Sequence, residues 1–346
     1  SAPVTVRTLS RFLEYSLAIS AWKQAGEVRW ALRVNPSSGN LHPTEGYLLI
    51  DAVPGIAPIP GLYHYAAKEH ALELRAALPE SSFVSLTQEF PPEAFLVGFT
   101  SVNWRETWKY GERAFRYCQH DVGHAIGGAR IAARTLGWRM LLLDGLADDT
   151  VAALLGVDRP EDFGGAEREH PDCLAVVWPD DQDPGLPTGN SLSLPLSLPP
   201  DAVRDMPRHT WHGKANRLSR DDPVQWEILN QVEVASWKSS AERRVIELDR
   251  GGPAAQTPIH LSAQAPGIAP GQPGAGEVIR QRRSALAFDG KTSISAGSFF
   301  TMLARVMPRI DRDLCRRPMP WDVLPWEPAV HLALFVHRVD GLAPGL

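Results

Sequence analysis

The chain has 346 residues, and at about 100–200 residues per domain this length predicts two domains with ordinary cores, since 44% of the residues are hydrophobic. Acidic residues outnumber basic ones by 40 to 35, and the net charge of -5 argues against nucleic acid as a partner, which usually needs a basic face. No uncharged apolar run approaches the roughly 18–20 residues of a membrane span. The three cysteines, Cys118, Cys173 and Cys315, form neither a disulfide framework nor a metal-ligand set. We therefore expect a soluble, cytoplasmic protein with no membrane partner.

The first half of the chain predicts a mixture of helices and short strands. Apolar side chains recur at helical spacing over 8–19, whereas 45–50 and 173–177 are short β-rich runs. Between those runs, 111–136 carries the longest helical pattern. The pair Gly127–Gly128 interrupts this helix at about 1 kcal/mol per glycine relative to Ala, which predicts close packing of a backbone or ligand there.

The second half begins with connecting sequence. Residues 180–201 are rich in Pro, Gly, Ser and Asp, 225–236 predicts a short amphipathic helix, and 251–276 has the Pro/Gly/Ala-rich composition of a linker. The domain boundaries that we predict are therefore a first domain at 1–180, a connecting segment at 181–275 and the start of a second domain at 276–346.

The sequence after the linker repeats the start of the chain. The apolar pattern of 4–13 recurs in 294–303, and the Pro/Gly-rich turn of 53–62 recurs in 339–346. Chance similarity of such turns is the alternative. We expect a tandem duplication whose second copy is cut short, so that the chain is a piece of a longer protein.

Small hydroxyl and amide side chains surround a glycine in 33–40. A turn of this composition offers many hydrogen-bond donors and lets a ligand approach the backbone closely. A plain turn leading into a strand is the alternative. The candidate binding residues of this segment are Arg33, Pro36, Ser37, Ser38 and Asn40.

Two further segments carry candidate chemistry. Lys109 and Tyr110 place an amine beside a phenol at the entrance to the long helix. Arg282, Arg283 and Ser284 set two guanidinium groups and a hydroxyl at the start of a segment, a set that suits a phosphate. Taken alone, each segment is also compatible with a solvated charged face.

Together these segments resemble the nitroreductase family of FMN flavoproteins, and most closely its SagB-type (azoline dehydrogenase) branch. The resemblance covers about 4–178 as one near-complete domain, includes 123–125 and 154–158, and begins again at about Gly276. It implies an α+β, nitroreductase-like fold, in which a central antiparallel or mixed sheet is flanked by helices and two copies form a pseudo-dimer within the chain. Further oligomerisation is compatible with it.

The family's motifs imply roles for the candidate residues. An Arg-x-Ser that binds the FMN phosphate carries over to Arg282 and Ser284, with Arg283 between them. The family's Pro-Ser-Ser-x-Asn turn contacts the flavin of the opposite copy and carries over to 36–40, so one composite FMN site is expected. A second site is doubtful because 316–323 stands where the second turn belongs. Leu286 also departs from the family, in which a basic residue often faces the flavin at that position.

The branch resemblance implies a reaction and two catalytic residues. A peptide thiazoline or oxazoline would lose a proton and a hydride, the hydride passing to FMN N5 and then to O2 or another acceptor. Lys109 would act as the base if burial favours its neutral amine, and Tyr110 would relay the proton or hold the substrate. The alternatives are an NAD(P)H-dependent nitro or quinone reductase of a small molecule and a degenerate flavin-fold scaffold.

Two histidines on the long helix need a separate interpretation. His120 and His124, with Asp121 between them, are similar to the H-E-x-x-H zinc signature. Asp is a shorter base than Glu, and no third ligand follows at the required spacing. We therefore expect no metal and interpret these histidines as helix residues near the flavin.

Overall fold

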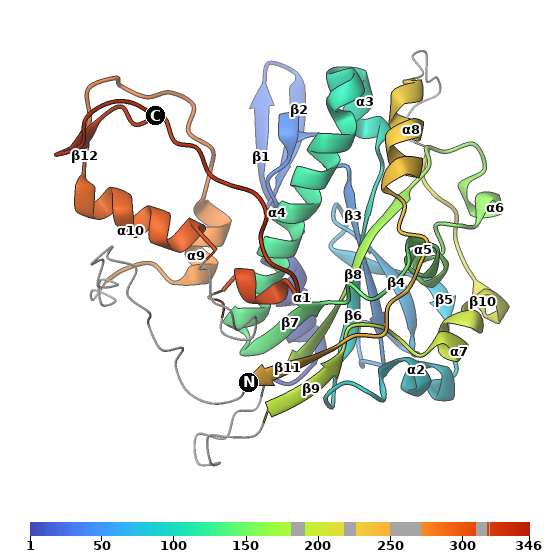
Figure 1. Cartoon of the computed structure of the whole chain (residues 1–346). Coiled ribbons are helices and arrows are strands. Elements are labelled where there is room, and N and C mark those ends of the chain that lie inside the picture. The colour runs from blue at the N-terminus through green and yellow to red at the C-terminus, as the bar shows by residue number, and fades with distance from the viewer. Residues whose placement is uncertain (181–190, 218–225, 250–270, 309–316, 318) are drawn as a thin grey trace.

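A seven-stranded antiparallel sheet organises the first 249 residues (Figure 1). The computed structural model describes residues 1–180, 191–217, 226–249, 271–308, 317 and 319–346. The strand order is β10-β5-β4-β3-β6-β8-β7. The strands are β3 Thr44–Ile50, β4 Gly61–Ala66, β5 Ala71–Ala77, β6 Phe95–Ser101, β7 Trp138–Leu142, β8 His170–Pro179 and β10 Thr210–Trp211.

Strand β3 shows how the sheet separates two cores. Every residue of β3 is buried, and successive side chains point to opposite faces. Leu48 and Ile50 face the cluster beneath α1 (Val6–Glu14) and α4 (Ala114–Thr135), whereas Tyr47 and Leu49 face the cluster beneath the helices of the other layer. Those helices are α2 Glu80–Thr87, α5 Asp148–Leu155, α6 Pro160–Phe163 and α7 Pro200–Arg204. The α+β fold with a sheet flanked by helices is therefore confirmed.

Local patterns located some of the elements of this part. The strand expected at 45–50 is β3, the run 173–177 lies within β8, and the long helix is α4, preceded by a 3-10 turn, η2 (Gly111–Arg113). The helix expected over 8–19 ends instead at Glu14, and β1 (Ile19–Ala25) begins at the end of that range. Strand β1 pairs with β2 (Val28–Arg33) in a hairpin, and the chain then enters the turn at 36–40.

The glycine pair within α4 has two different environments. A Cβ on Gly128 would lie 3.5 Å from the backbone oxygen of Ser16, an ordinary van der Waals distance, so the chain after α1 packs against this position and an alanine would also fit. A Cβ on Gly127 would have nothing within 4 Å among the described residues. The expected close packing is thus present at Gly128 only.

The described parts of 191–249 pack onto the core cluster that contains Tyr47 and Leu49. Strand β9 (Ser191–Pro195) pairs with β11 (Val245–Asp249), and Leu194 and Ile246 join the cluster that contains Tyr47. The predicted amphipathic helix is α8 (Glu227–Ser236), which contacts α4, while Gln225 lies outside the described residues. The composition of 180–201 predicted connecting sequence and gave no indication of β9 or of the start of α7.

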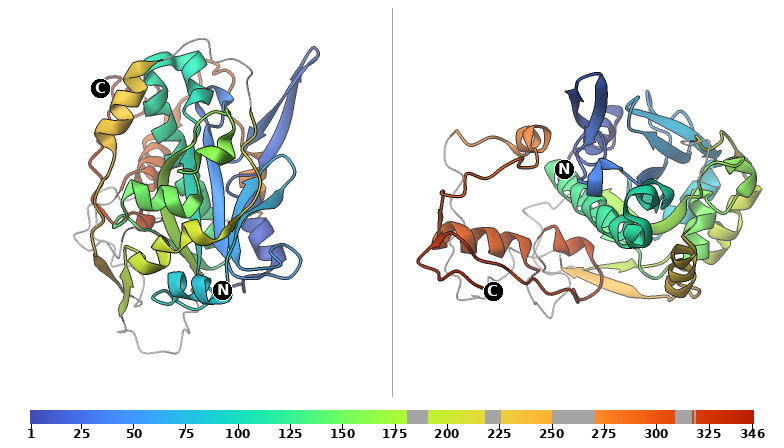
Figure 2. Two further views of the ribbon diagram at one scale, coloured as in Figure 1. Left: turned by 90° about the vertical axis from the view of Figure 1, so that its right-hand side faces the viewer. Right: turned by 90° about the horizontal axis from the view of Figure 1, so that it is seen from above.

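Residues 271–346 add small elements beside α4 rather than further strands of the main sheet (Figure 2). None of the residues of α9 or α10 is buried. Polar contacts help to attach the described residues of this part to the first domain: Arg280 lies 3.4 Å from Glu14, and Asp322 pairs with Arg130. The elements are α9 Ala275–Gln281, β12 Ile294–Ser295, α10 Ala296–Val306, the 3-10 turn η5 Trp321–Val323 and β13 Val339–Asp340.

Two further points concern sequence expectations. Most of the predicted linker, 250–270, lies outside the described residues, as do Cys315 and Arg316. Within the part of the chain that the structure describes, no helix combines the length and the apolar character needed to cross a bilayer.

Candidate functional site

The turn at 36–40 is held in a backbone shape that few residue types adopt. Gly39, Asn40 and His42 have φ angles of 63°, 62° and 51°, in the left-handed region that Gly and Asn tolerate best. The Asn40 side chain donates a hydrogen bond to the Ala31 carbonyl at 2.8 Å, and the Ser37 hydroxyl accepts one from the His42 amide at 2.8 Å. The turn, part of which is the 3-10 helix η1 (Ser38–Asn40), is therefore tied both to β2 and to its own exit.

Two side chains of helix α4 contact the backbone of the turn. The carboxylate of Asp121 is fully buried and accepts hydrogen bonds from the Ser38 amide at 3.1 and 3.3 Å. Burial raises the pKa of Asp121, and hydrogen bonds from Ser37 and Ser38 oppose that effect. His124 Nδ1 lies 3.1 Å from the Pro36 carbonyl, to which a protonated Nδ1 donates.

The zinc-like spacing on α4 therefore serves a different purpose. Asp121 and His124 hold the turn, and no group of three or more His, Cys, Asp or Glu side chains among the described residues is arranged for a metal ion. The sequence predicts the histidines of this motif near the ligand, but the contacts of Asp121 and His124 with the turn were not predicted.

The turn and the Lys109–Tyr110 pair meet at one point. A Cβ on Gly39 would lie 2.6 Å from the Tyr110 hydroxyl and 2.7 Å from Lys109 Nζ, so only glycine leaves these atoms in place. Both residues come from α3 (Trp104–Tyr110), which packs beside α4 (Figure 1). The Tyr110 ring also contacts the Tyr117 ring, with centroids 4.3 Å apart. Two motifs separated by some 70 positions in the sequence thus form one group.

The exposure of the pair differs from expectation. The Lys109 side chain is exposed, and its Nζ lies 5.5 Å from the centroid of the Tyr110 ring. The burial that would favour the neutral amine is therefore not provided by the described residues alone. Tyr110 is half-buried, and burial raises the pKa of its hydroxyl.

Buried polar groups without partners occur on α3 and beside the turn in the sequence. Glu106 on α3 is fully buried, and neither carboxyl oxygen has a hydrogen-bond partner among the described residues. Burial, and then the charge of Asp121, raise the pKa of Glu106 to about 8. Asn35 and Thr44, at the two ends of the segment that contains the turn, also have buried side-chain atoms without partners in the described chain.

Arg33 belongs to a separate charged cluster at the entry to β3. It donates to the Thr44 carbonyl at 3.2 Å and lies 4.0 Å from the Glu45 carboxylate, which also pairs with Arg105 and His64. Burial opposes ionisation of Glu45, but Arg105 and His64 hold its pKa well below the usual value. Arg33 therefore supports the strand that follows the turn.

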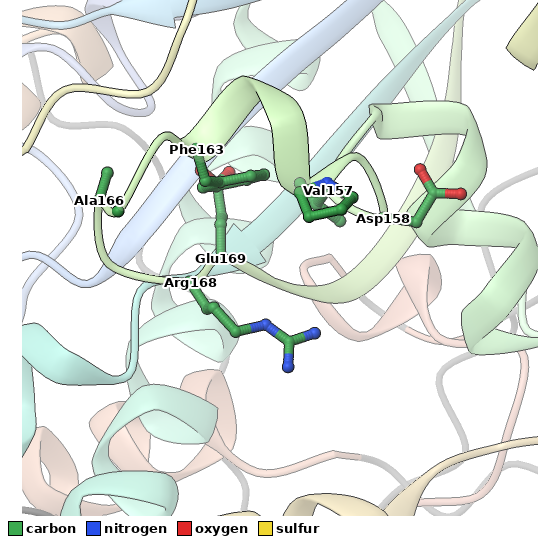
Figure 3. Close-up of a pocket in the computed structure, with 8 residues that line it drawn as sticks. Val157, Asp158, Phe163, Ala166, Arg168 and Glu169 are labelled. Atoms are coloured by element: carbon green, nitrogen blue, oxygen red, sulfur yellow. The ribbon is translucent and has the colours of Figure 1, made fainter.

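Two cavities lie near this cluster, on the α5–α6 side of the sheet. A cavity of about 140 Å³ is bordered by charged groups, including Glu45, His64 and Arg105. A larger one of about 490 Å³ is lined by residues of 157–169, which include Val157, Phe163 and Glu169 (Figure 3). Neither is lined by Lys109 or Tyr110, so the catalytic candidates occupy a different place.

The phosphate-binding candidates lie at the surface after α9. Arg283 donates to the carbonyls of Arg280 and Arg282 and, at 3.3 Å, to that of Ser20 on β1. The side chains of Arg282 and Ser284 are exposed and have no hydrogen-bond or ion-pair partner among the described residues. No such contact in the described chain joins these residues to the turn at 36–40. The contact at Ser20 does bring Arg283 to the hairpin that leads into the turn.

The sequence and the fold match known proteins. Residues 3–166 match the model of the nitroreductase family. The chain is 26% identical over 161 residues to MJ1384 of Methanocaldococcus jannaschii, named as a candidate nitroreductase, a match that covers 45% of this chain and 77% of that protein. It is 31% identical over 132 residues to the trifolitoxin-processing protein TfxB of Rhizobium leguminosarum bv. trifolii, covering 36% of this chain and 35% of TfxB.

A solved structure supports the same fold. The crystal structure of a candidate nitroreductase from Anabaena variabilis matches 98% of this chain and 64% of its own, with a TM-score of 0.59 and 19% sequence identity. The chain therefore spans less than two thirds of that protein and of TfxB.

Proposed function

Residues 3–166 form a nitroreductase-family domain, and from this premise we propose that the chain belongs to a flavoenzyme that oxidises an azoline ring in a peptide. The family is one of FMN-dependent oxidoreductases. The observation that carries the finer proposal is the meeting of Lys109 and Tyr110 at Gly39, because an amine and a phenol there form an acid–base pair. The similarity to TfxB, a protein named for processing trifolitoxin, favours a peptide substrate.

The free donors of the chain fit FMN. The Arg282 guanidinium and the Ser284 hydroxyl are exposed and have no partner in the described residues, so they suit a phosphate group. FMN, when bound, supplies the acceptor for two electrons and a hydrogen. The residues that we propose to hold it are Arg282, Arg283 and Ser284 at the phosphate and Pro36, Ser37, Ser38 and Asn40 at the rings.

Lys109 and Tyr110 have distinct proposed roles. Lys109 Nζ takes the proton from the ring carbon of the azoline, so its amine becomes an ammonium while the ring becomes aromatic. Because Lys109 is exposed in the described chain, bound substrate and flavin must supply the exclusion of water that favours the free amine. Tyr110 lies beside the amine and orients the substrate through its hydroxyl.

A pair of lysine variants tests this assignment. Lys109→Ala is expected to lower turnover of a peptide thiazoline at least about 100-fold, the loss typical of a missing general base, while the absorbance of bound flavin stays unchanged. Lys68→Ala, at an exposed position between β4 and β5, is the matched control and retains activity. Full turnover by Lys109→Ala contradicts the role.

The same preparation distinguishes the other functions. Nitro or quinone reduction with NAD(P)H, without azoline oxidation, identifies a reductase instead. A protein that cannot be loaded with flavin identifies a scaffold.

We also propose that 276–346 begins a second copy of the domain. Thr5 caps α1 and accepts a hydrogen bond from the Thr8 amide; Ser295 caps α10 and accepts one from the Ser298 amide. The number of positions between Thr5 and Ser295 equals the number between the two copies of the apolar pattern, 4–13 and 294–303. This agreement supports a shared origin of the two segments. One composite FMN site per chain follows from this proposal, and release of two FMN molecules per chain contradicts it.

A further inference from the structure

The indole ring of Trp226 lies against the turn that follows Lys109 and Tyr110. Three atoms of its six-membered ring would be 2.9, 3.0 and 3.3 Å from a Cβ on Gly111. Gly111 is buried and has a φ of 54° and a ψ of -127°, a conformation that residues with a side chain rarely adopt. Both the backbone and the ring therefore exclude a side chain at this position.

The turn at Gly111 determines where α3 ends. The Gly111 amide donates a hydrogen bond to the Thr107 carbonyl and closes the last turn of α3, and the chain then enters η2 and α4. Lys109 and Tyr110 are the last two residues of α3, and their terminal atoms are the ones that lie at Gly39. The direction of both side chains therefore depends on the backbone at this turn.

The segment that carries Trp226 is also tied to other parts of the fold. Trp226 precedes α8, which contacts α4 and lies beside α3 (Figure 1). Glu233 of α8 pairs with His170 at the start of β8. Beyond α8, the Lys238 amide donates to the Asp148 carboxylate on α5 at 2.8 Å. These contacts give the ring a support that does not depend on α3.

We propose that Trp226 is a positioning residue for the acid–base pair: its ring holds the turn at Gly111 and thereby keeps the amine and the phenol at Gly39. The inference rests on the proposed function, in which Lys109 is the base. Trp226 lies outside 3–166, the range that matches the nitroreductase family model. The connecting part of the chain therefore completes the site that the family domain begins.

Variants at this position test the effect on turnover. Trp226→Ala removes the ring and is expected to lower kcat of azoline oxidation at least about tenfold, with a smaller change in KM, because a displaced base impairs the chemical step more than binding. Trp226→Phe keeps an aromatic ring at the turn and should recover most of the loss. Trp237→Ala removes the same residue type at the other end of α8 and should retain the kcat of the wild type. Equal kcat in Trp226→Ala and Trp237→Ala overturns the inference.

Acetylation of lysines measures the position of Lys109 without turnover. The chain has six lysines, and mass spectrometry follows the reaction of each with acetic anhydride. Lys109 Nζ lies 5.5 Å from the centroid of the Tyr110 ring, and a contact of this kind stabilises the unreactive ammonium. In Trp226→Ala the released turn no longer holds the amine over the ring, so Lys109 should react about 2–5-fold faster while the other lysines keep their rates. An unchanged rate at Lys109, or an equal increase at all the lysines, overturns the inference.

The two measurements separate failure of the inference from failure of the proposed function. If Trp226→Ala accelerates acetylation of Lys109 alone, but the wild type oxidises no azoline, the positioning contact is supported and the proposed function fails. If the wild type oxidises azolines and Trp226→Ala has the same kcat, the proposed function is supported and the inference fails.

Discussion

The Lys109 side chain occupies the space that a Cβ on Gly39 would need, with Nζ 2.7 Å from that position. A residue larger than glycine at position 39 would therefore collide with the Lys109 amine. The hydroxyl of Tyr110 lies equally close, at 2.6 Å. Because both atoms are the far ends of long side chains, they can move when the space is filled.

Substitution of Gly39 by Ala should therefore separate activity from stability. The φ angle of 63° costs Ala about 1–2 kcal/mol of folding free energy, and the new methyl group displaces Lys109 and Tyr110. Azoline turnover is expected to fall at least about tenfold, since a displacement of 1 Å in a catalytic group has effects of this size or larger.

Gly26→Ala is the matched control for this substitution. Gly26 also has a positive φ, 58°, but a Cβ there would have nothing within 4 Å among the described residues. Urea unfolding should show a similar loss of stability in both variants, with activity lost in Gly39→Ala alone. Equal activity in the two variants would mean that the position of the pair is unimportant.

Local sequence patterns predicted several of the elements, but not the contacts between residues that are distant in the sequence. Strand β3 and helix α4 follow from apolar periodicity, because burial of a regular face leaves a regular pattern. The role of Asp121 could not be obtained this way, since its partner, the Ser38 amide, is 83 positions away. Glu106 stands in a polar stretch between two tryptophans, where nothing in the sequence marks it as buried.

The capping hydroxyls were a signal that sequence analysis could have used. Thr5 and Ser295 each have a hydroxyl residue three positions later, a pattern typical of the start of a helix. This pattern would have placed the start of α1 more accurately than the apolar periodicity did. The end of α1 needed the β1–β2 hairpin, which the periodicity of 8–19 concealed.

The His64–Glu45 pair should make stability depend on pH in the alkaline range. Burial lowers the pKa of His64, but hydrogen bonding and charge from Glu45 outweigh burial and raise it to about 9. A raised pKa in the folded state means that the contribution is complete below the unfolded value of about 6.5 and is lost as pH rises through 9. The contribution of His64 to the free energy of unfolding is on the order of 3 kcal/mol. It arises from the same interaction that lowers the pKa of Glu45.

Unfolding in urea at pH 6 and pH 9.5 measures this loss. The wild type should be less stable at the higher pH, and His64→Gln should reduce the difference by on the order of 3 kcal/mol because glutamine does not titrate. The buried Glu106 carboxyl, whose pKa is raised to about 8, contributes to the difference that remains. His212→Gln is the control, since the structure gives His212 no carboxylate partner among the described residues. A difference of the same size in wild type and His64→Gln would contradict the assignment.

The partly buried pair of Arg130 and Asp322 should hold the described residues 319–346 against α4. Arg130 is 4% exposed and donates to both carboxylate oxygens of Asp322, at 2.9 and 2.5 Å, while Val323 enters the core beside it. Asp322→Ala leaves a buried guanidinium whose only partner among the described residues is the Trp138 carbonyl, at 3.3 Å. Breaking a fully buried pair costs about 3–5 kcal/mol and a pair at the surface contributes less than about 1 kcal/mol, so with Asp322 27% exposed we expect a cost between these limits.

Limited proteolysis combined with urea unfolding tests this attachment. In Asp322→Ala, cleavage within 319–346 should become faster at denaturant concentrations where the wild type resists it, because the segment detaches before the sheet unfolds. Asp201→Ala removes a pair of similar chemistry, with Arg204, whose side chains are 90% and 75% exposed, and it should behave as wild type. If Asp322→Ala is as resistant as Asp201→Ala, then the apolar contact of Val323, and not the ion pair, holds the segment in place.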